Sequence, residues 1–195
     1  MTAFPADVPM VARHFGSLYA KRKIGPLLSA SAMRAPCGVH WVVEHYGPDP
    51  GAEYLEALPA DDRSRMQRFD PLPFHDAVER VHEPGLLVMI QPELLHRQVP
   101  TKLFDYLCTG NPVLLLSTAE SAAWEVARPF DRCFRADPED SQGIARILAG
   151  LEERRTAGEL FQVPTVDDTR HLTKRSIGRA FTSSVERLLR SSPNP

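Results

Sequence analysis

The stretch VPTKLFDYLCTGNPVLLLS, from Val99 to Ser117, joins an amphipathic segment to a continuous apolar run. The spacing of its first apolar residues predicts a helix over 100–109, and Gly110 is a typical residue to end it. The apolar run that follows is typical of a strand covered on both faces. The stretch therefore predicts a helix that carries Lys102 and Asp105 one turn apart, followed by a buried strand.

Short apolar runs alternate in this way with helical patterns at least five times along the chain. Strands are expected at 11–15, 39–47, 85–92, 112–117 and 132–137, with a brief one within 68–73. Helices are expected at 24–33, 52–58, 60–69, 74–83, 100–109, 119–128 and 138–155, with a long last helix from about Asp167. The alternation predicts an α/β fold, a Rossmann-like, mainly parallel sheet sandwiched by helices.

The composition supports a folded domain and excludes some classes of partner. Hydrophobic residues make up 43% of the 195 residues and charged residues 25%, which is enough apolar side chain for an ordinary core. The formal net charge is −2, so no strong basic field favours nucleic acid as a partner. The three cysteines, Cys37, Cys108 and Cys133, lie too far apart to predict a disulfide framework or a metal site.

Targeting signals are not visible in the sequence. Its longest apolar runs, 86–90 and 113–116, are far too short to span a bilayer. The start, MTAFPADVPM, lacks the basic residues and apolar segment of a signal peptide. We therefore expect a cytoplasmic protein without a transmembrane segment.

Several common ligand signatures of α/β proteins are absent. The chain has no G-x-G-x-x-G dinucleotide fingerprint, no G-x-x-x-x-G-K-[ST] phosphate loop and no G-x-S-x-G nucleophile elbow. His40 and His45 flank Glu44, but strand alternation places His45 on the opposite face from the other two, so no metal site is predicted.

Two basic residues and one carboxylate remain as candidates. Arg22 lies at the entrance to the first predicted helix, and Lys102 lies in the first turn of the helix over 100–109. Parallel sheets bind ligands at the carboxyl ends of their strands, where such helices begin. Helix N-terminal amides with an arginine and a lysine suit a diphosphate, and Asp105 could accept hydrogen bonds from ribose hydroxyls. The alternative is that Lys102 and Asp105 form an ordinary exposed ion pair.

Four segments, in this order and at this spacing, resemble a known family. They are HFGSLYAKRKIGPLLSA, VVEHYGP, LPFHDAVERVHEPGLLVMIQPE and VPTKLFDYLCTGNPVLLLS. From Val11 to Leu151 the chain resembles the C-terminal, nucleotide-sugar-binding half of GT-B fold glycosyltransferases of the large retaining group (group 1, family 4-like). The block over 100–113 is the most specific part, because it is similar to the family pattern P-x-K-L-x-E-Y-x-x-x-G-x-P-V.

The resemblance implies a role for each matching residue. Gly16, with Ser17 and Tyr19 in the same loop, would lie against the donor diphosphate. Arg22 and Lys102 would be the catalytic basic residues that neutralise it.

Asp105 falls where the family has the ribose-binding glutamate. Leu72 and Pro73 fall where the backbone of family members usually contacts the nucleotide base. The chain departs from the family pattern in three places: Asp105 replaces Glu, Arg97 stands where a paired acid is usual, and Ser17 stands where many relatives have a second arginine.

The function that the resemblance implies is transfer of a sugar from a nucleotide diphosphate sugar to an acceptor, without a metal or another cofactor. The donor base, the sugar, the acceptor and the stereochemical outcome stay open. So does the alternative of a non-catalytic nucleotide-binding or scaffold module derived from this fold. An epimerase of the same fold is a third reading, for which no catalytic acid and histidine could be assigned.

The resemblance also implies a missing N-terminal domain or subunit, because the family's acceptor site belongs to that half. We expect an irregular lead-in over 1–10, a donor-binding domain over 11–162, a C-terminal loop and helix over 163–190 that pack toward the missing half, and a tail over 191–195. The last helix carries an apolar stripe for that contact, formed by Ile177, Phe181, Val185 and Leu188. Peripheral membrane association through the missing half is left open.

Overall fold

A computed structural model describes residues 9–19, 22–48, 51–159 and 164–173, together with residues 175, 176, 178, 179, 182, 183 and 186. The apolar stripe expected on the last helix lies outside these described residues.

A six-stranded sheet forms the centre of the domain, and every pairing in it is parallel. The strands are β1 (Met10–Phe15), β2 (Trp41–Tyr46), β3 (Met66–Phe69), β4 (Leu86–Ile90), β5 (Val113–Leu116) and β6 (Cys133–Ala136). Their order is β3-β2-β1-β4-β5-β6. From β1 the chain adds β2 and β3 on one side, and it then adds β4, β5 and β6 on the other side, so the strand order reverses between β1 and β4. This reversal creates a topological switch point, where α/β sheets bind ligands beyond the carboxyl ends of the strands.

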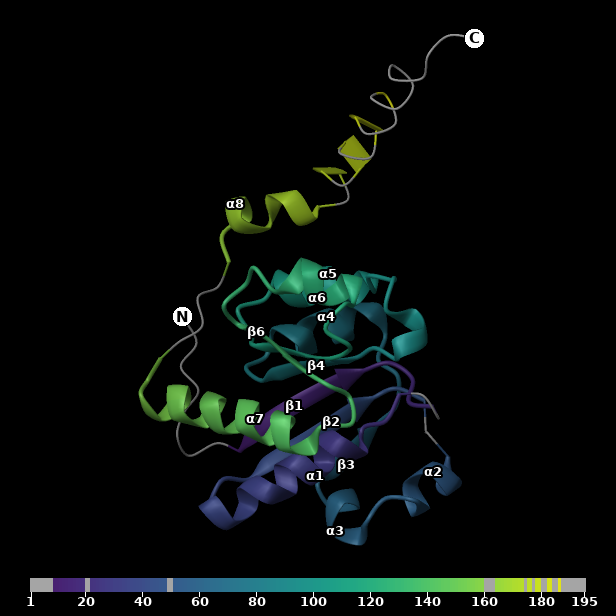
Figure 1. Cartoon of the computed structure of the whole chain (residues 1–195), viewed down its shortest axis with the longest axis vertical. Helices are drawn as coiled ribbons and strands as arrows, with labels where there is room; N and C mark the ends of the chain where they lie inside the picture. The colour runs from purple at the N-terminus through teal and green to yellow at the C-terminus, as the bar shows by residue number, and fades with distance from the viewer. Residues whose placement is uncertain are drawn as a thin grey trace.

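Helices cover both faces of the sheet (Figure 1). One face is covered by α1 (Gly25–Arg34), α2 (Ala52–Glu56), α3 (Ala60–Arg63) and α7 (Ser141–Thr156). The other is covered by α4 (Phe74–His82), α5 (Thr101–Leu107) and α6 (Ala122–Ala127). Short 3-10 turns occur at Ala35–Cys37, Glu93–Leu95 and Arg170–Leu172, and α8 (Val166–Thr169) precedes the last of them. The predicted α/β fold with a parallel sheet is confirmed.

Two hydrophobic cores lie on the two faces of the sheet, and β4 shows how one strand serves both. Leu86, Val88 and Ile90 belong to the core beneath α1 and α7. Leu87 and Met89 belong to the core beneath α5 and α6. Because side chains alternate along a strand, a strand buried on both faces must be apolar throughout. The continuous apolar runs in the sequence have this physical origin.

The sequence prediction was wrong for the segment before β3. A helix was expected over 60–69, but the helix α3 ends at Arg63 and the strand β3 begins at Met66. The strand lies at the edge of the sheet and three of its four residues are exposed, so it lacks the apolar pattern of the inner strands. Pairing with β2 stabilises it as a strand despite its polar sequence.

The expected long last helix is divided at Thr173, whose backbone is extended. The Thr173 hydroxyl accepts a hydrogen bond from the amide of Ser176, which is the usual role of a helix N-cap. Just before the division, Leu172 is buried in the core beneath α5 and α6. The segment that ends at Leu172 is therefore anchored to this domain.

A buried carboxylate, Glu152, attaches α7 to the sheet and to α1. It accepts a hydrogen bond of 2.7 Å from the indole Nε1 of Trp41 on β2. It also forms an ion pair of 2.7 Å with Arg34 at the end of α1. Both partners come from distant parts of the sequence, so this carboxylate holds three elements together.

We expect Glu152→Ala to destabilise the fold by about 3 kcal/mol, because it leaves the buried Trp41 indole and the half-buried Arg34 without their acceptor. Glu153→Ala removes the same side chain from an exposed neighbouring position in α7 and is the matched control. Urea unfolding of both variants gives the comparison. Equal losses of unfolding free energy would contradict the role given to Glu152.

Candidate functional site

The site lies at the carboxyl edge of the sheet, on both sides of the switch point. Gly16 directly follows β1, and its amide donates to the carbonyl oxygen of Tyr46 at the end of β2 at 2.9 Å. Beyond β4, the buried Gln91 donates from Nε2 to the carbonyl oxygens of Leu95 and Gln98, at 2.7 and 2.6 Å. These bonds fix the loop that leads into α5, and so fix the position of Lys102.

Lys102 extends from the first turn of α5 to the end of β1. Its half-buried ammonium donates to the backbone carbonyl oxygen of Phe15. Burial, and next the charge of Arg22, lower the pKa of Lys102. The side chain is therefore not the exposed half of a surface ion pair; it is held beneath the loop that follows β1.

The loop above Lys102 requires a glycine at position 16 for two reasons. Gly16 has a φ of +123°, a conformation that other residues rarely adopt. A Cβ at this position would also lie 2.7 Å from Nζ of Lys102. The backbone of the loop can approach the ammonium closely only because no side chain separates them.

Arg22 contributes the second cation from the residues that lead into α1. Its guanidinium carbon lies 4.9 Å from the centre of the Tyr19 ring, a cation–π contact. Its Nε atom is buried and makes no hydrogen bond within the part of the chain that the structure describes. Among the described ion pairs, none joins Arg22 or Lys102 to a carboxylate. Two neighbouring cations that join no carboxylate among the described ion pairs favour an anion as the ligand.

Two buried histidines lie at the ends of β1 and β2. His14 and His45 occupy matching positions of the two paired strands, and their Nδ1 atoms are 3.1 Å apart. Burial, and next the charges of His45, Lys102 and Arg22, hold the pKa of His14 well below its usual value. His14 is therefore neutral at neutral pH.

A groove between α4 and α5 begins at Lys102. Its volume is about 350 Å³, and most of its lining is apolar. The lining residues are Phe15, Phe74, Ala77, Val78, Val81, His82, Lys102, Asp105, Tyr106 and Cys108. The Phe74 side chain is 80% exposed although it is aromatic, which makes it available to a flat apolar ligand.

Phe15 in the groove belongs to a row of stacked aromatic rings across the strand ends. The rings of Phe15 and Tyr46 are stacked with centroids 5.0 Å apart, and those of Tyr46 and Phe69 with centroids 4.7 Å apart. Tyr106 meets Phe15 edge-on at 6.4 Å. The row fixes the ring of Phe15, and with it one wall of the groove.

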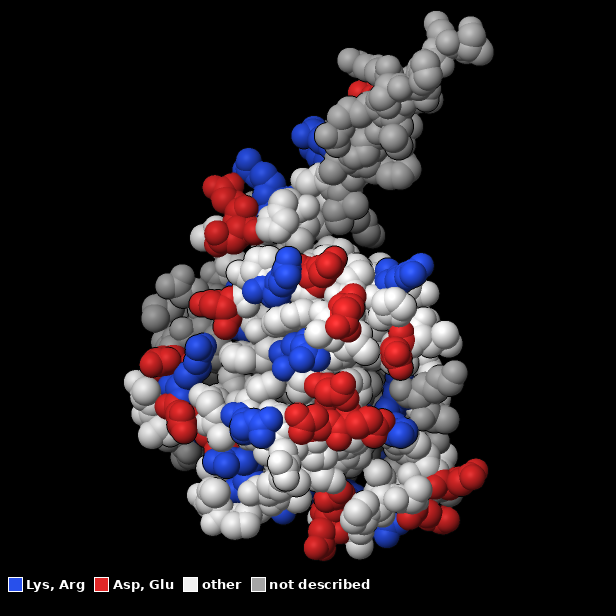
Figure 2. Space-filling model, in the orientation of Figure 1, with Lys and Arg blue, Asp and Glu red and all other residues white. Residues whose placement is uncertain are grey.

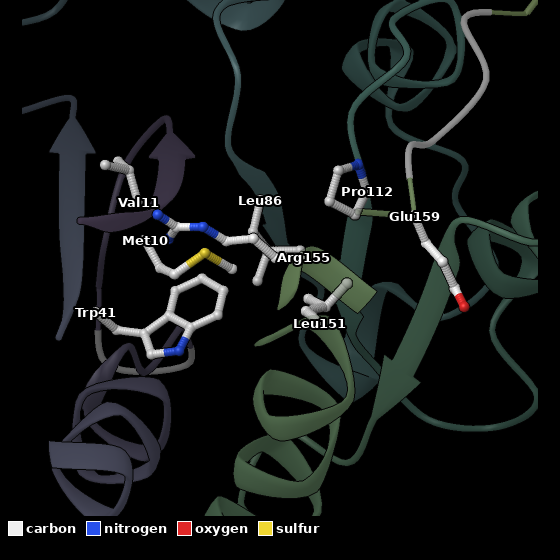
Figure 3. A pocket seen from close by; sticks show the side chains of 8 residues that line it. All are labelled: Met10, Val11, Trp41, Leu86, Pro112, Leu151, Arg155 and Glu159. Atoms are coloured by element: carbon white, nitrogen blue, oxygen red, sulfur yellow. The ribbon is translucent and has the colours of Figure 1, made fainter. Parts of the chain in front are cut away.

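Two further cavities differ from this site in chemistry or in place. A cavity of about 440 Å³ beyond β4, β5 and β6 is lined by Glu93, Asp137 and Glu139, and its Lys23 is paired with Glu139 at 3.0 Å. A much smaller one, about 20 Å³, lies at the opposite, amino-terminal edge of the sheet, where Trp41, Leu86 and Leu151 surround it (Figure 3). That volume holds about one water molecule.

One face of the molecule carries charges of both signs. On the face shown in Figure 2, acidic and basic side chains are interspersed, and neither sign forms a large patch. Among the described residues, no cluster of three or more His, Cys, Asp or Glu side chains could bind a metal ion. The described helices are all too short or too polar to cross a bilayer.

The structure brings together most of the residues that the sequence singled out. Gly16 and Lys102 lie against each other, and the charge of Arg22 lowers the pKa of Lys102. The Tyr19 ring packs against the Arg22 guanidinium. Asp105 lines the groove that begins at Lys102.

The other predicted residues lie close to these. Leu72 and Pro73 lead into Phe74, which lines the groove, and Pro73 is the N-cap residue of α4. Ser17 is half-buried in the loop after Gly16. The site residues chosen from the sequence included neither His14 nor Phe74, although Phe74 ends one of the strand-end segments where the sequence placed the function. The signal for them was their place, two residues before Gly16 and directly after Pro73.

Comparison with known proteins identifies the fold. No protein-family model matches the sequence, and no curated protein matches it. The C-terminal domain of a group 1 glycosyl transferase (LpcC) from Francisella tularensis matches 87% of this chain over 89% of its own length, with a TM-score of 0.61 and 12% identity. TarM matches 93% of the chain with a TM-score of 0.65 and 9% identity.

AviGT4, a glycosyltransferase involved in avilamycin A biosynthesis, matches 95% of the chain with a TM-score of 0.58 and 12% identity. The chain spans 53% of AviGT4 and 36% of TarM. The fold is thus that of one domain of these glycosyltransferases.

We expect Gly16→Ala to destabilise the protein by about 1–3 kcal/mol, because alanine is strained at this φ and its methyl group would displace the Lys102 ammonium. Gly150→Ala, within α7 and with open space around a Cβ, is the matched control and should leave the stability unchanged or raise it by up to about 1 kcal/mol. Urea unfolding measures both. A Gly16→Ala variant as stable as the wild type would show that the loop does not need glycine.

Proposed function

We propose that this chain binds a nucleotide diphosphate sugar and is the donor-binding half of a glycosyltransferase. The observation that carries the proposal is the order of chemical groups along the site. Lys102 and Arg22 form a cationic end, Asp105 follows on α5, and the apolar groove between α4 and α5 continues from there. A nucleotide diphosphate has the same order, with an anionic diphosphate, a ribose with hydroxyl groups and a flat, largely apolar base.

The proposed contacts follow from this match. The diphosphate lies against Lys102, Arg22 and the backbone at Gly16, at the positive N-terminal end of the ten-residue helix α1. Asp105 accepts hydrogen bonds from the ribose hydroxyls. The base enters the groove, where Phe74 and the apolar face of α4 contact it. The groove volume of about 350 Å³ is in the range of small-molecule sites.

The chemical role of this domain is to stabilise the leaving group. When the bond between the sugar and the diphosphate breaks, negative charge increases on the diphosphate oxygens. Lys102 and Arg22 are already fixed beside that position, so they stabilise the transition state without moving. In this proposal the two side chains supply the positive charge for which other transferases use a metal ion.

The acceptor is proposed to bind in a second domain, supplied by a longer chain or by another subunit. The fraction of AviGT4 and TarM that this chain spans supports this division. Full transfer activity is then expected only when both halves are present.

We expect Lys102→Ala to weaken nucleotide-sugar binding by severalfold to about tenfold, because it removes one charge-assisted contact with the diphosphate. Isothermal titration with UDP-glucose, GDP-mannose, ADP-glucose and dTDP-glucose, after a thermal-shift screen of the same four, measures the loss. Arg146→Ala, which removes an exposed cation from α7, is the control and should bind as the wild type does. Unchanged affinity in Lys102→Ala would count against the site.

A further inference from the structure

His14 and His45 form a buried pair directly beneath the loop at Gly16. Their side chains lie on the α1 side of the sheet, and the residues are 3% and 1% exposed. The two rings are stacked with centroids 5.2 Å apart, and their Nδ1 atoms are 3.1 Å apart. A hydrogen bond between two Nδ1 atoms requires one ring to donate and the other to accept.

His45 has a second contact that bears on which ring donates. Its Nε2 atom lies 3.3 Å from the carbonyl oxygen of Pro48, which can only accept. With the hydrogen on Nε2 of a neutral His45, its Nδ1 atom is the acceptor. His14 then donates from its own Nδ1, and its Nε2 keeps a lone pair. No hydrogen bond to Nε2 of His14 occurs among the described residues.

The surroundings of His14 disfavour a positive charge on its ring. The described groups that act on its charge are His45 on β2, Lys102 on α5 and Arg22 in the loop before α1. The nearby carboxylate of Glu44 extends from the other face of β2 and is bonded to Arg13 at 2.7 Å. In the free protein, burial, the neighbouring His45 ring and the charges of Lys102 and Arg22 keep His14 neutral. A bound diphosphate would reverse the sign of the field at its ring.

We propose that His14 is a third ligand of the diphosphate and binds it as an imidazolium, taking up one proton from solution when the anion binds. The inference rests on the proposed function, because it needs the diphosphate beside Lys102 and Arg22. The proton is added to Nε2, the atom with the unused lone pair, and the bond from Nδ1 to His45 is kept. Three cations then face the anion in place of two.

Proton uptake separates His14 from the other two cations. Lysine and arginine side chains keep their charge near neutral pH, so they add no pH dependence to binding there. His14 is neutral without ligand and charged with it. Affinity should therefore fall by up to about tenfold for each unit of rising pH, between the lowered pKa of free His14 and its raised pKa in the complex.

Calorimetry of nucleotide-sugar binding measures the uptake directly. UDP-glucose, GDP-mannose, ADP-glucose and dTDP-glucose are suitable probes, because their diphosphate diesters do not titrate near neutral pH. Each binding probe is titrated at about pH 7 in two buffers of different ionisation enthalpy. The wild type should take up about one proton, and His14→Gln should bind more weakly and take up none. Binding without uptake in the wild type, or full uptake in His14→Gln, overturns the inference.

A second variant keeps the test decisive if His14→Gln does not fold. The chain has seven histidines, and the other five are His40, His75, His82, His96 and His171. Replacing all five by glutamine leaves only the buried pair. Uptake retained in this variant supports the inference, and uptake lost in it overturns the inference. If none of the four nucleotide sugars binds the wild type at any pH, the proposed function itself fails, which is a distinguishable result.

Discussion

The site depends on the contact between the Lys102 ammonium and the carbonyl oxygen of Phe15. Phe15 ends β1 and Lys102 begins the helix after β4, so the contact joins the two chain segments that separate at the switch point. It holds the lysine beneath the loop at Gly16, where its charge is half-buried. A cation in this position is stabilised by one carbonyl dipole and would gain more from an anion.

The site differs in its electrostatics from two buried ion pairs of the same domain. Two buried charges elsewhere in the described chain are paired, Arg13 with Glu44 at 2.7 Å and Glu152 with Arg34 at 2.7 Å. At the carboxyl edge of the sheet, Arg22 and Lys102 instead lie near each other, and their like charges help to keep His14 neutral. This arrangement costs stability unless an anion binds, and such costs are typical of functional sites.

The sequence predicted the layers of the fold because they depend on local pattern. Runs such as Leu86–Ile90 and Val113–Leu116 are apolar throughout since both of their faces are buried, and α4 has its apolar residues on one side. The prediction from sequence failed at β3, a polar edge strand that is stabilised by pairing with β2. Lys102 and Gly16 could be singled out through the block over 100–113 and the loop after the first strand. The partners of His14 could not, because they depend on strand register and on a helix far along the chain.

The central claim is that the cations beneath the Gly16 loop bind a diphosphate whose nucleoside occupies the α4–α5 groove. A crystal structure of the chain with whichever of the four nucleotide sugars binds most tightly tests it most directly. The account predicts diphosphate oxygens within hydrogen-bond distance of Lys102 Nζ and of the Arg22 guanidinium, with the base beside Phe74. A diphosphate bound elsewhere, for example in the cavity lined by Glu93, Asp137 and Glu139, would contradict it.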